Sequence, residues 1–350
     1  MEGVFLHGRF AERIKNQMKM ISHSYTAPAF NLASEEYLLR TAQDDICMLW
    51  RNSPSVIIGR YQNAYAEIDQ EFVRENDICV VRRLTGGGAV FHDLGNLNFT
   101  FITDGKRNAL DFERFTEPIV KALRALRLEV SLSGRNDLTI DGLKFSGNAQ
   151  CLYPVGEGAA VRYKTMHHGT LLLNADLSRL AGALRADPEK IRSKGISSVR
   201  SRVANLAPYL ASPMNAEEFQ KYLEDSISAY CGAQPIEWSA EDKKGIQELA
   251  DKKYSTWEWN FGESKQFAIQ RKHRFPFGTL EIQMEADKGR LMELRFFGDF
   301  FSGEEPEKLA VLLKGVRLHA EELTHALSAA GGAGRFIAGA ENEDIVSLLL

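Results

Sequence analysis

The sequence lacks the two common glycine-rich patterns that bind nucleotide phosphates. It contains no Gly-x-x-x-x-Gly-Lys-Ser/Thr segment, and no Gly-x-Gly-x-x-Gly segment follows a strand-like run. This excludes a P-loop and a dinucleotide-binding fingerprint. A nucleotide site in this chain must therefore be built in another way.

Cysteine is scarce, with four residues in a chain of 350. The four are widely spaced, and none forms a Cys-x-x-Cys pair: Cys47, Cys79, Cys151 and Cys231. This spacing excludes a disulfide framework and a cysteine-based zinc site. It predicts reduced thiols and a cytoplasmic protein.

Long apolar runs and a strong excess of one charge are also missing. No run approaches the roughly 18 apolar residues that a membrane span needs, and the formal net charge is -4. These features predict a protein that binds neither membrane nor nucleic acid in general. Residues 1–20 have no secretory apolar core and carry acidic residues, so we expect an N-terminal extension.

The most unusual stretch is three consecutive glycines, residues 86–88, directly after Arg82, Arg83 and two further residues. Each glycine would cost about 1 kcal/mol in a helix, and strand-like runs flank the stretch at 78–81 and 89–91. Glycine suits positive φ or a close backbone approach. Freed N–H groups can cradle an anion, with the arginines supplying positive charge at the rim. A flexible hairpin with solvated arginines is the alternative, and the flanking strands favour the anion site.

Residues 82–93 resemble the Arg-Arg-x-Ser/Thr-Gly-Gly-Gly-Ala-Val-Phe-His-Asp signature of the lipoate–protein ligase A family, within the biotin/lipoate ligase superfamily. Further blocks of the family recur in its order along the chain beyond the N-terminal extension. The resemblance implies an α/β (α+β) fold with a large mixed-sheet catalytic domain, residues 21–250. A small C-terminal α+β domain, residues 251–350, would follow it.

A second block surrounds Lys144. Asp141-Gly142 lies between strand-like runs 138–140 and 143–145, a strong signal for a type I′ hairpin. A lysine among apolar strand neighbours usually faces solvent. However, the segments 134–138 and 144–149 match the family's Gly-Arg-Asn-Asp-Leu and Lys-x-Ser-Gly-Asn/Ser-Ala blocks, so the resemblance makes Lys144 functional. Asp137 would either orient this lysine or hold a magnesium ion, and the sequence leaves both roles open.

The resemblance implies a reaction in two steps. Lipoate and ATP give lipoyl-AMP and pyrophosphate, and the lipoyl group then passes to a lysine of an acceptor protein. Because a carboxylate attacks the α-phosphorus, catalysis must position like charges and neutralise them. Lys144 would bridge the carboxylate and the α-phosphate, and Mg²⁺ would neutralise the pyrophosphate. The acceptors implied are lipoyl domains of 2-oxoacid dehydrogenase E2 subunits and the glycine cleavage H protein.

The same resemblance assigns residues to the nucleotide. Arg83 would bind phosphate oxygens, and the backbone of four residues would wrap the nucleotide: Gly88, Ala89, Val90 and Phe91. His167 and His168 are adjacent on a predicted strand, so they point to opposite faces and cannot ligate one metal together. Core packing is their expected use, and in the family this segment lines the substrate cavity, which makes His168 a predicted lipoate contact.

Two alternatives concern the reaction. An octanoyl or lipoyl transferase needs no ATP and uses a cysteine nucleophile. In the carrier-dependent enzymes this cysteine precedes Gly-Ile. Here Lys194 precedes Gly195-Ile196, which counts against a transferase. Cys151 remains as a thiol, and we expect it to be structural. A non-catalytic paralogue that binds lipoate or a lipoyl domain is the other alternative, and the presence of Arg83 and Lys144 argues against it.

The basic residues of the segment 185–202 usually mark a solvated linker. Residues 194–205 nevertheless repeat a family signature, which predicts either a loop that closes over the adenylate or a docking face for an acidic partner. Elsewhere the patterns predict a helix capped by Asn31, a helix that begins at Thr116, strands at 46–50 and 56–59, and a hairpin of 277–285 with 291–297. A single helix is expected over 306–327.

Overall fold

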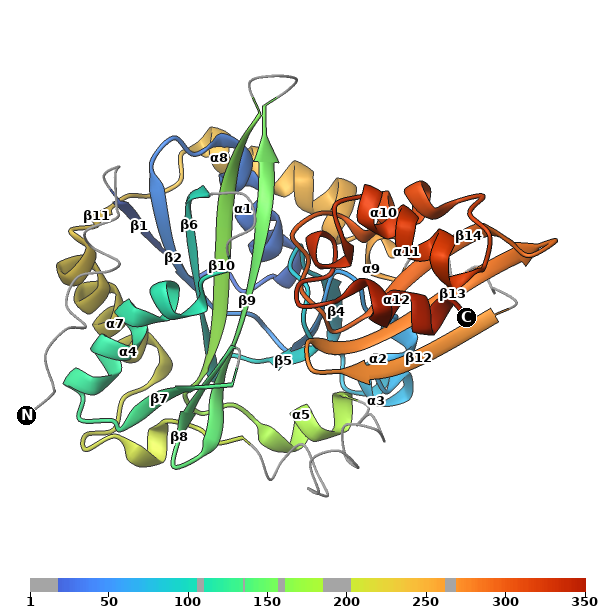
Figure 1. Ribbon diagram of the computed structural model, residues 1–350. Coiled ribbons are helices and arrows are strands. Elements are labelled where there is room, and N and C mark those ends of the chain that lie inside the picture. Colours follow the sequence, from blue (N-terminus) through green and yellow to red (C-terminus); the bar gives the residue numbers. More distant parts are fainter. Residues whose placement is uncertain (1–17, 106–109, 135, 157–160, 185–202, 262–268) are drawn as a thin grey trace, which may run out of the picture.

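A computed structural model describes residues 18–105, 110–134, 136–156, 161–184, 203–261 and 269–350 (Figure 1). Its centre is an eight-stranded mixed sheet in the order β11-β1-β2-β6-β10-β9-β8-β7. In chain order the strands are β1 (Met18–Ser22), β2 (Asp45–Trp50), β6 (Asn96–Gly105), β7 (Val130–Ser133), β8 (Asp137–Ile140), β9 (Leu143–Val155), β10 (Arg162–Leu172) and β11 (Gln234–Pro235). β1 pairs in parallel with β2 and β11, and the other pairs are antiparallel. The predicted large mixed sheet is confirmed.

Both faces of this sheet are covered by helices. Because strand side chains alternate, Leu49 and Phe99 join the core under α4 (Phe112–Ala125) and α7 (Ala216–Cys231), whereas Met48 and Trp50 pack toward α1 (Pro28–Thr41) and α8 (Ala240–Leu249). Figure 1 shows α4 and α7 side by side at one side of the sheet. The shorter helical segments are α2 (Ala64–Glu67), α3 (Gln70–Glu75), α5 (Leu177–Ala183), α9 (Trp257–Asn260), the 3₁₀ turns η4 (Ala207–Tyr209) and η6 (Ala333–Arg335), and the π-helical turn η5 (Ala250–Tyr254).

Helix α1 begins earlier than the sequence predicts. Pro28 occupies its first turn, where the missing N–H costs nothing, and Asn31 lies inside the helix rather than at its cap. The Asn31 amide is fully buried and donates to the carbonyls of Tyr25 and Arg51. The prediction of an Asn31 cap was therefore wrong, since this side chain ties three segments together instead.

Helix α4 also begins one turn before the predicted Thr116. Asp111 caps it by accepting a hydrogen bond from the backbone N–H of Arg114, which places Pro118 inside the helix. The helix itself was predicted, and its apolar residues Ile119 and Leu123 are fully buried against the large sheet.

A second, three-stranded sheet has the order β4-β3-β5, with β3 (Ser55–Ile58), β4 (Cys79–Arg82) and β5 (Val90–His92). The glycine stretch joins β4 to β5, yet these strands do not pair. Both flank β3, with β4 parallel and β5 antiparallel to it. The glycine stretch is thus a crossover bend and not a hairpin turn.

Residues 269–349 form a separate α+β unit with its own core. Three antiparallel strands, β12 (Ile269–Phe275), β13 (Gly278–Asp287) and β14 (Arg290–Gly298), pack against α10 (Pro306–Leu313), α11 (Ala320–Ala329) and α12 (Asn342–Leu349). The predicted hairpin is confirmed as β13–β14, whereas β12 and α12 were not predicted. The single helix over 306–327 is wrong, because α10 ends at Leu313. Lys314 is extended (ψ 130°), and Gly315 follows with a φ of 84° in the turn that leads out of the helix.

Among the described residues, no helix combines the length and the apolar character that crossing a membrane requires.

Candidate active site

A cavity of about 110 Å³ lies between α1, the second sheet and the face of the large sheet that carries Trp50. Six of the predicted site residues line it: Arg83, Gly88, Ala89, Val90, Lys144 and His168. Phe91 does not, because its side chain packs with Val56 and Ile58 in the core of the second sheet. Asp137 is absent from the lining, but it reaches the cavity through Lys144.

The register of the large sheet explains how distant residues share this cavity. Trp50 pairs with Asn98, and Asn98 pairs with Thr170 on the next strand. The Thr170 hydroxyl accepts from the backbone N–H of Gly147 at 3.1 Å, and Gly147 pairs with Asp137. Since neighbouring strands are about 4.8 Å apart, the cavity extends across several strands, from Lys144 at one end to Trp50 at the other.

The Lys144 ammonium lies 2.8 Å from Oδ1 of Asp137, and both side chains are about one-third exposed (37% and 36%). Asp141 and Gly142 both have positive φ, 51° and 77°, as the predicted type I′ turn requires. The β8–β9 ladder shifts register between Leu138 and Thr139, and such a bulge re-aims a nearby side chain. A Cβ at Gly147 would lie 3.0 Å from the Lys144 Nζ, so glycine there leaves room for the lysine.

The two arginines before the glycines are buried, so the alternative of a flexible hairpin with solvated arginines is wrong. Arg82 and Arg83 are 6% and 5% exposed, and burial lowers the pKa of each to about 10. Both remain charged at neutral pH. Arg82 donates to the carbonyls of Gly59, Gln62 and Asn260, so it fixes loops around the site.

Arg83 holds the glycine bend itself. Its Nη2 donates to the carbonyls of Gly86 and Gly88 at 2.7 and 2.8 Å, and its Nη1 donates to that of Ile57. Its Nε donates to the Thr85 hydroxyl at 2.9 Å. Four of the five N–H groups of the guanidinium are therefore engaged by described residues, which leave one Nη1 hydrogen without a partner among them.

The structure requires glycine at two positions of the bend, for separate reasons. Gly87 has a φ of 89°, and its N–H donates to the Phe300 carbonyl of the C-terminal unit. A Cβ on Gly86 would come within 2.1 Å of that same Phe300 oxygen, so close packing against the C-terminal unit requires glycine there. Around Gly88, by contrast, the nearest atom to such a Cβ is 4.0 Å away, in Asp299.

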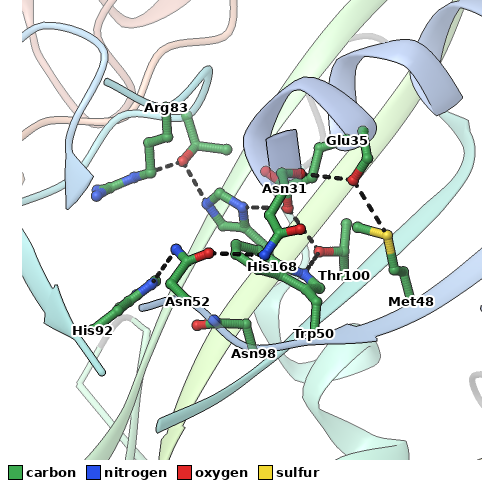
Figure 2. Close-up of polar contacts among 12 residues, drawn as sticks. Asn31, Glu35, Met48, Trp50, Asn52, Arg83, His92, Asn98, Thr100 and His168 are labelled. Carbon is green, nitrogen blue, oxygen red and sulfur yellow. Dashed lines mark hydrogen bonds and ion pairs between the residues drawn. The ribbon is translucent and has the colours of Figure 1, made fainter. Parts of the chain in front are cut away.

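A buried chain of hydrogen bonds leads away from Arg83 (Figure 2). Thr85 Oγ1 lies 2.8 Å from Nε2 of His168, and Nδ1 of His168 lies 2.8 Å from Oε1 of Glu35. The Thr100 hydroxyl donates to the same Glu35 oxygen at 2.7 Å and accepts from the Trp50 indole at 2.9 Å. Sequence reasoning missed Glu35, Thr85 and Thr100, which come from separate elements with no shared spacing.

The two adjacent histidines lie on opposite faces, as predicted. His168 lines the cavity. His167 stacks on Phe115 and Phe99 in the opposite core, with ring centroids 5.2 and 5.9 Å apart, and burial lowers its pKa well below the usual range. Among the described residues, no group of three or more His, Cys, Asp and Glu side chains is arranged to hold a metal.

The remaining thiol near the site fits a structural role. Cys151 is not among the residues that line the cavity, and burial raises its pKa well above that of a free thiol. Lys194, whose place before Gly195-Ile196 argues against a transferase, lies outside the described part of the chain. So does most of the predicted loop or docking face at 194–205, because residues 185–202 are not described.

The chain matches two family models. Residues 27–228 match the lipoyl protein ligase A/B catalytic domain, and residues 264–349 match the C-terminus of bacterial lipoate protein ligases. It is 40% identical to lipoate–protein ligase 1 of Staphylococcus aureus over 89% of this chain and 94% of the relative. It is also 40% identical to the lipoate–protein ligase LplJ of Bacillus subtilis, over 82% and 86% of the two chains.

Solved structures share the fold. Plasmodium falciparum LipL1 in complex with lipoate has a TM-score of 0.72 at 22% identity, over 94% of this chain and 97% of that one. A lipoate–protein ligase A bound with ATP has a TM-score of 0.59 at 27% identity, over 70% and 99%. A bipartite ligase of Thermoplasma acidophilum, studied with its E2 lipoyl domain, has a TM-score of 0.60 at 29% identity, over 73% and 100%.

Proposed function

Because the chain belongs to the lipoyl protein ligase A/B family, we propose that it activates lipoate with ATP and then transfers the lipoyl group to a lysine of an acceptor protein. The observation that carries this proposal is the meeting of the Lys144 ammonium and the glycine bend in one cavity. A carboxylate and a triphosphate can approach each other only where positive charge and backbone donors are already in place.

Lys144 has the central role. Its ammonium would contact a carboxylate oxygen of lipoate and an oxygen of the α-phosphate, reducing their repulsion while the new C–O–P linkage forms and pyrophosphate leaves. The ion pair with Asp137 holds the ammonium in place until the substrates bind. The lipoyl-AMP anhydride is then activated toward the ε-amine of the acceptor lysine, which attacks the carbonyl carbon and releases AMP.

The glycine bend would bind the nucleotide through its backbone. Gly88, Ala89 and Val90 line the cavity, and Gly88 has open space beside its Cα. Arg83 shapes this bend with most of its N–H groups and has one Nη1 hydrogen for a phosphate oxygen. Phe91 contributes backbone at most, because its side chain lies in the core.

The acyl chain of lipoate would lie along the apolar part of the cavity. Leu32, Trp50 and Ile57 line it beside His168, so His168 would contact the chain from the sheet. Magnesium would arrive with the triphosphate of ATP. Asp137 has a second carboxylate oxygen beyond the one paired with Lys144, so it fits as a single protein ligand beside phosphate oxygens and water.

Lipoyl domains of 2-oxoacid dehydrogenase E2 subunits and the glycine cleavage H protein are the acceptors we propose. The T. acidophilum relative, studied with its E2 lipoyl domain, supports the first class. The four unpaired cysteines support the proposed cytoplasmic location.

A mass-spectrometric assay tests this function directly. Wild-type protein, ATP, Mg²⁺ and lipoate should add one lipoyl mass to an isolated lipoyl domain, with pyrophosphate released in the first step. Lys144→Ala should abolish lipoyl-AMP formation while leaving the thermal unfolding transition in place. Modification of the domain without ATP, when an acyl carrier protein loaded with the lipoyl or octanoyl group replaces free lipoate, would instead identify a transferase that breaks the carrier thioester. Binding of lipoate with no turnover would identify a non-catalytic relative.

A further inference from the structure

Among the described strands, β9 loses its β10 neighbour before it reaches Lys144. The pairing of β9 with β10 extends to Asn148, which lies opposite Gly169, and Lys144 lies beyond this last pair, nearer the hairpin turn. On its other edge Lys144 pairs with Thr139 of β8, beside the register shift in that ladder. Because a backbone edge needs partners for its polar groups, the position of Lys144 depends on contacts from outside these strands.

A short segment, residues 203–207, supplies this contact. It forms a parallel β-bridge with Lys144, and the backbone N–H of Ala204 donates to the Lys144 carbonyl at 2.9 Å. Two residues further along, the N–H of Leu206 donates to the carbonyl of Leu172 at 2.7 Å. The segment thus connects the backbone of the lysine to the end of β10.

The side chain of Asn205 holds this segment from the side opposite the core. Ala204 and Leu206 are buried and belong to the core under α4 and α7. Between them, Oδ1 of Asn205 accepts from the backbone N–H of Ala175 at 3.0 Å, and its Nδ2 donates to the Ala175 carbonyl at 2.9 Å. The orientation of this amide is fixed, because the reverse orientation would place donor against donor and acceptor against acceptor.

The residue that Asn205 binds lies in a turn that is itself held to the large sheet. The N–H groups of Leu173 and Asn174 both donate to the carbonyl of Gly95, at 3.1 and 3.0 Å, and Ala175 follows them as a buried residue. Asn205 therefore ties the segment to a fixed point, one residue away from the N–H group that holds the Lys144 carbonyl.

We propose that Asn205 is a positioning residue for Lys144 and acts through the backbone N–H of Ala204. This inference rests on the proposed role of Lys144 in lipoyl-AMP formation. Loss of the amide would release the segment from Ala175, weaken the hydrogen bond between Ala204 and Lys144, and let the end of β9 shift. The ammonium would then leave the position in which it meets both substrates, and such misplacement slows the chemical step more than it weakens substrate binding.

The experiment compares wild type with Asn205→Ala, Asn205→Asp and Asn342→Ala. Asn205→Asp keeps an acceptor for the Ala175 N–H and loses only the donated bond. Asn342 is a matched control, because its Oδ1 also accepts from a backbone N–H, that of Ala333 in the C-terminal unit, at 2.9 Å. Lipoyl-AMP formation is followed in a single turnover, with saturating enzyme and lipoate in excess over labelled ATP. The rate constant is then independent of the fraction of each variant that is folded.

Hydrogen exchange measured by mass spectrometry reports the bond itself, because the Ala204 amide exchanges when it leaves the Lys144 carbonyl. We expect Asn205→Ala to exchange faster at Ala204 and to lower the single-turnover rate constant about tenfold. Steady-state KM values for ATP and lipoate should change less than about twofold. Asn205→Asp should lower the rate constant by a smaller factor, and Asn342→Ala should leave it unchanged.

An unchanged rate constant in Asn205→Ala would overturn the proposal, and so would an equal fall in Asn342→Ala. A lower rate constant without faster exchange at Ala204 would also overturn it, because Asn205 would then not act through this bond. If Asn205→Ala does not fold, the same two measurements on Asn205→Asp decide. If wild type forms no lipoyl-AMP from ATP and lipoate, the ligase function itself fails, an outcome that differs from an unchanged rate constant in the variant.

Discussion

The hydroxyl of Thr85 lies 2.8 Å from Nε2 of His168, although 83 positions separate the two residues in the chain. This contact joins the wall of the acyl cavity to the glycine bend, because the same hydroxyl accepts from Nε of Arg83. Arg83 in turn holds the carbonyls of Gly86 and Gly88. The part of the cavity that we propose for the acid and the part that we propose for the nucleotide are thereby linked by buried hydrogen bonds.

Removing this hydroxyl should weaken the nucleotide half of the site. In Thr85→Val the shape is retained, but the Arg83 Nε and the His168 Nε2 lose a shared partner, and a buried unsatisfied group costs about 1–3 kcal/mol. We expect the KM for ATP in lipoyl-AMP formation to rise about tenfold, with a smaller change in the KM for lipoate. Thr85→Ser keeps the hydroxyl and should restore the ATP KM. Equal rises in both KM values would show that Thr85 supports only the general packing.

The glycine bend offers a matched pair of substitutions. Gly86→Ala would place a Cβ 2.1 Å from the Phe300 carbonyl oxygen, so the bend or the C-terminal unit must move, at a cost of about 1–3 kcal/mol. Gly88→Ala meets no atom closer than 4.0 Å and should change the free energy of unfolding by less than about 0.5 kcal/mol. Urea unfolding of both variants tests the difference. Equal stability of the two would contradict the close contact between the bend and Phe300.

The space around Lys144, for which we propose a catalytic role, can be tested at Gly147. In Gly147→Ala the new methyl group would lie 3.0 Å from Nζ of Lys144 and 3.1 Å from its Cε. The lysine is flexible, so we expect the fold to persist while the ammonium shifts from its pairing with Asp137. The rate of lipoyl-AMP formation should fall about tenfold or more, since misplacement by a fraction of an ångström is costly in catalysis. Wild-type rates in this variant would show that the lysine does not depend on its present position.

The sequence predicts the parts of this site that depend on local chemistry. Asp141 and Gly142 predict their hairpin because few residues accept positive φ at both turn positions, and the apolar face of α4 follows from helical periodicity. The burial of Arg82 and Arg83 could not be predicted in this way, since their partners are carbonyls from distant loops. Helix α1 shows no alternation of apolar and polar faces, because it is buried on nearly all sides. For the same reason Glu35 could not be recognised from the sequence as a buried residue of the site.

A buried carboxyl at the start of β2 makes stability depend on pH. Asp45 is 5% exposed, and burial raises its pKa from 3.8 to about 6, against the opposing effects of a hydrogen bond from the Asp104 backbone and the charges of Arg114 and Lys164. A raised carboxyl pKa means that the native state prefers the protonated form. The stabilisation that Asp45 contributes is thus complete below pH 3.8 and is lost as the pH rises through about 6.

Asp45→Asn removes this titration while keeping an oxygen that can accept the same hydrogen bonds. We expect the variant to gain stability relative to wild type as the pH rises, with a difference about 1 kcal/mol larger at pH 8 than at pH 5. Urea unfolding of both proteins at the two pH values measures it. Because the other titrating groups are common to both proteins, their contributions cancel in the comparison. A difference that stays constant, or that shrinks as the pH rises, would mean that Asp45 ionises as readily in the folded protein as in the unfolded chain, and that the charges of Arg114 and Lys164 outweigh its burial.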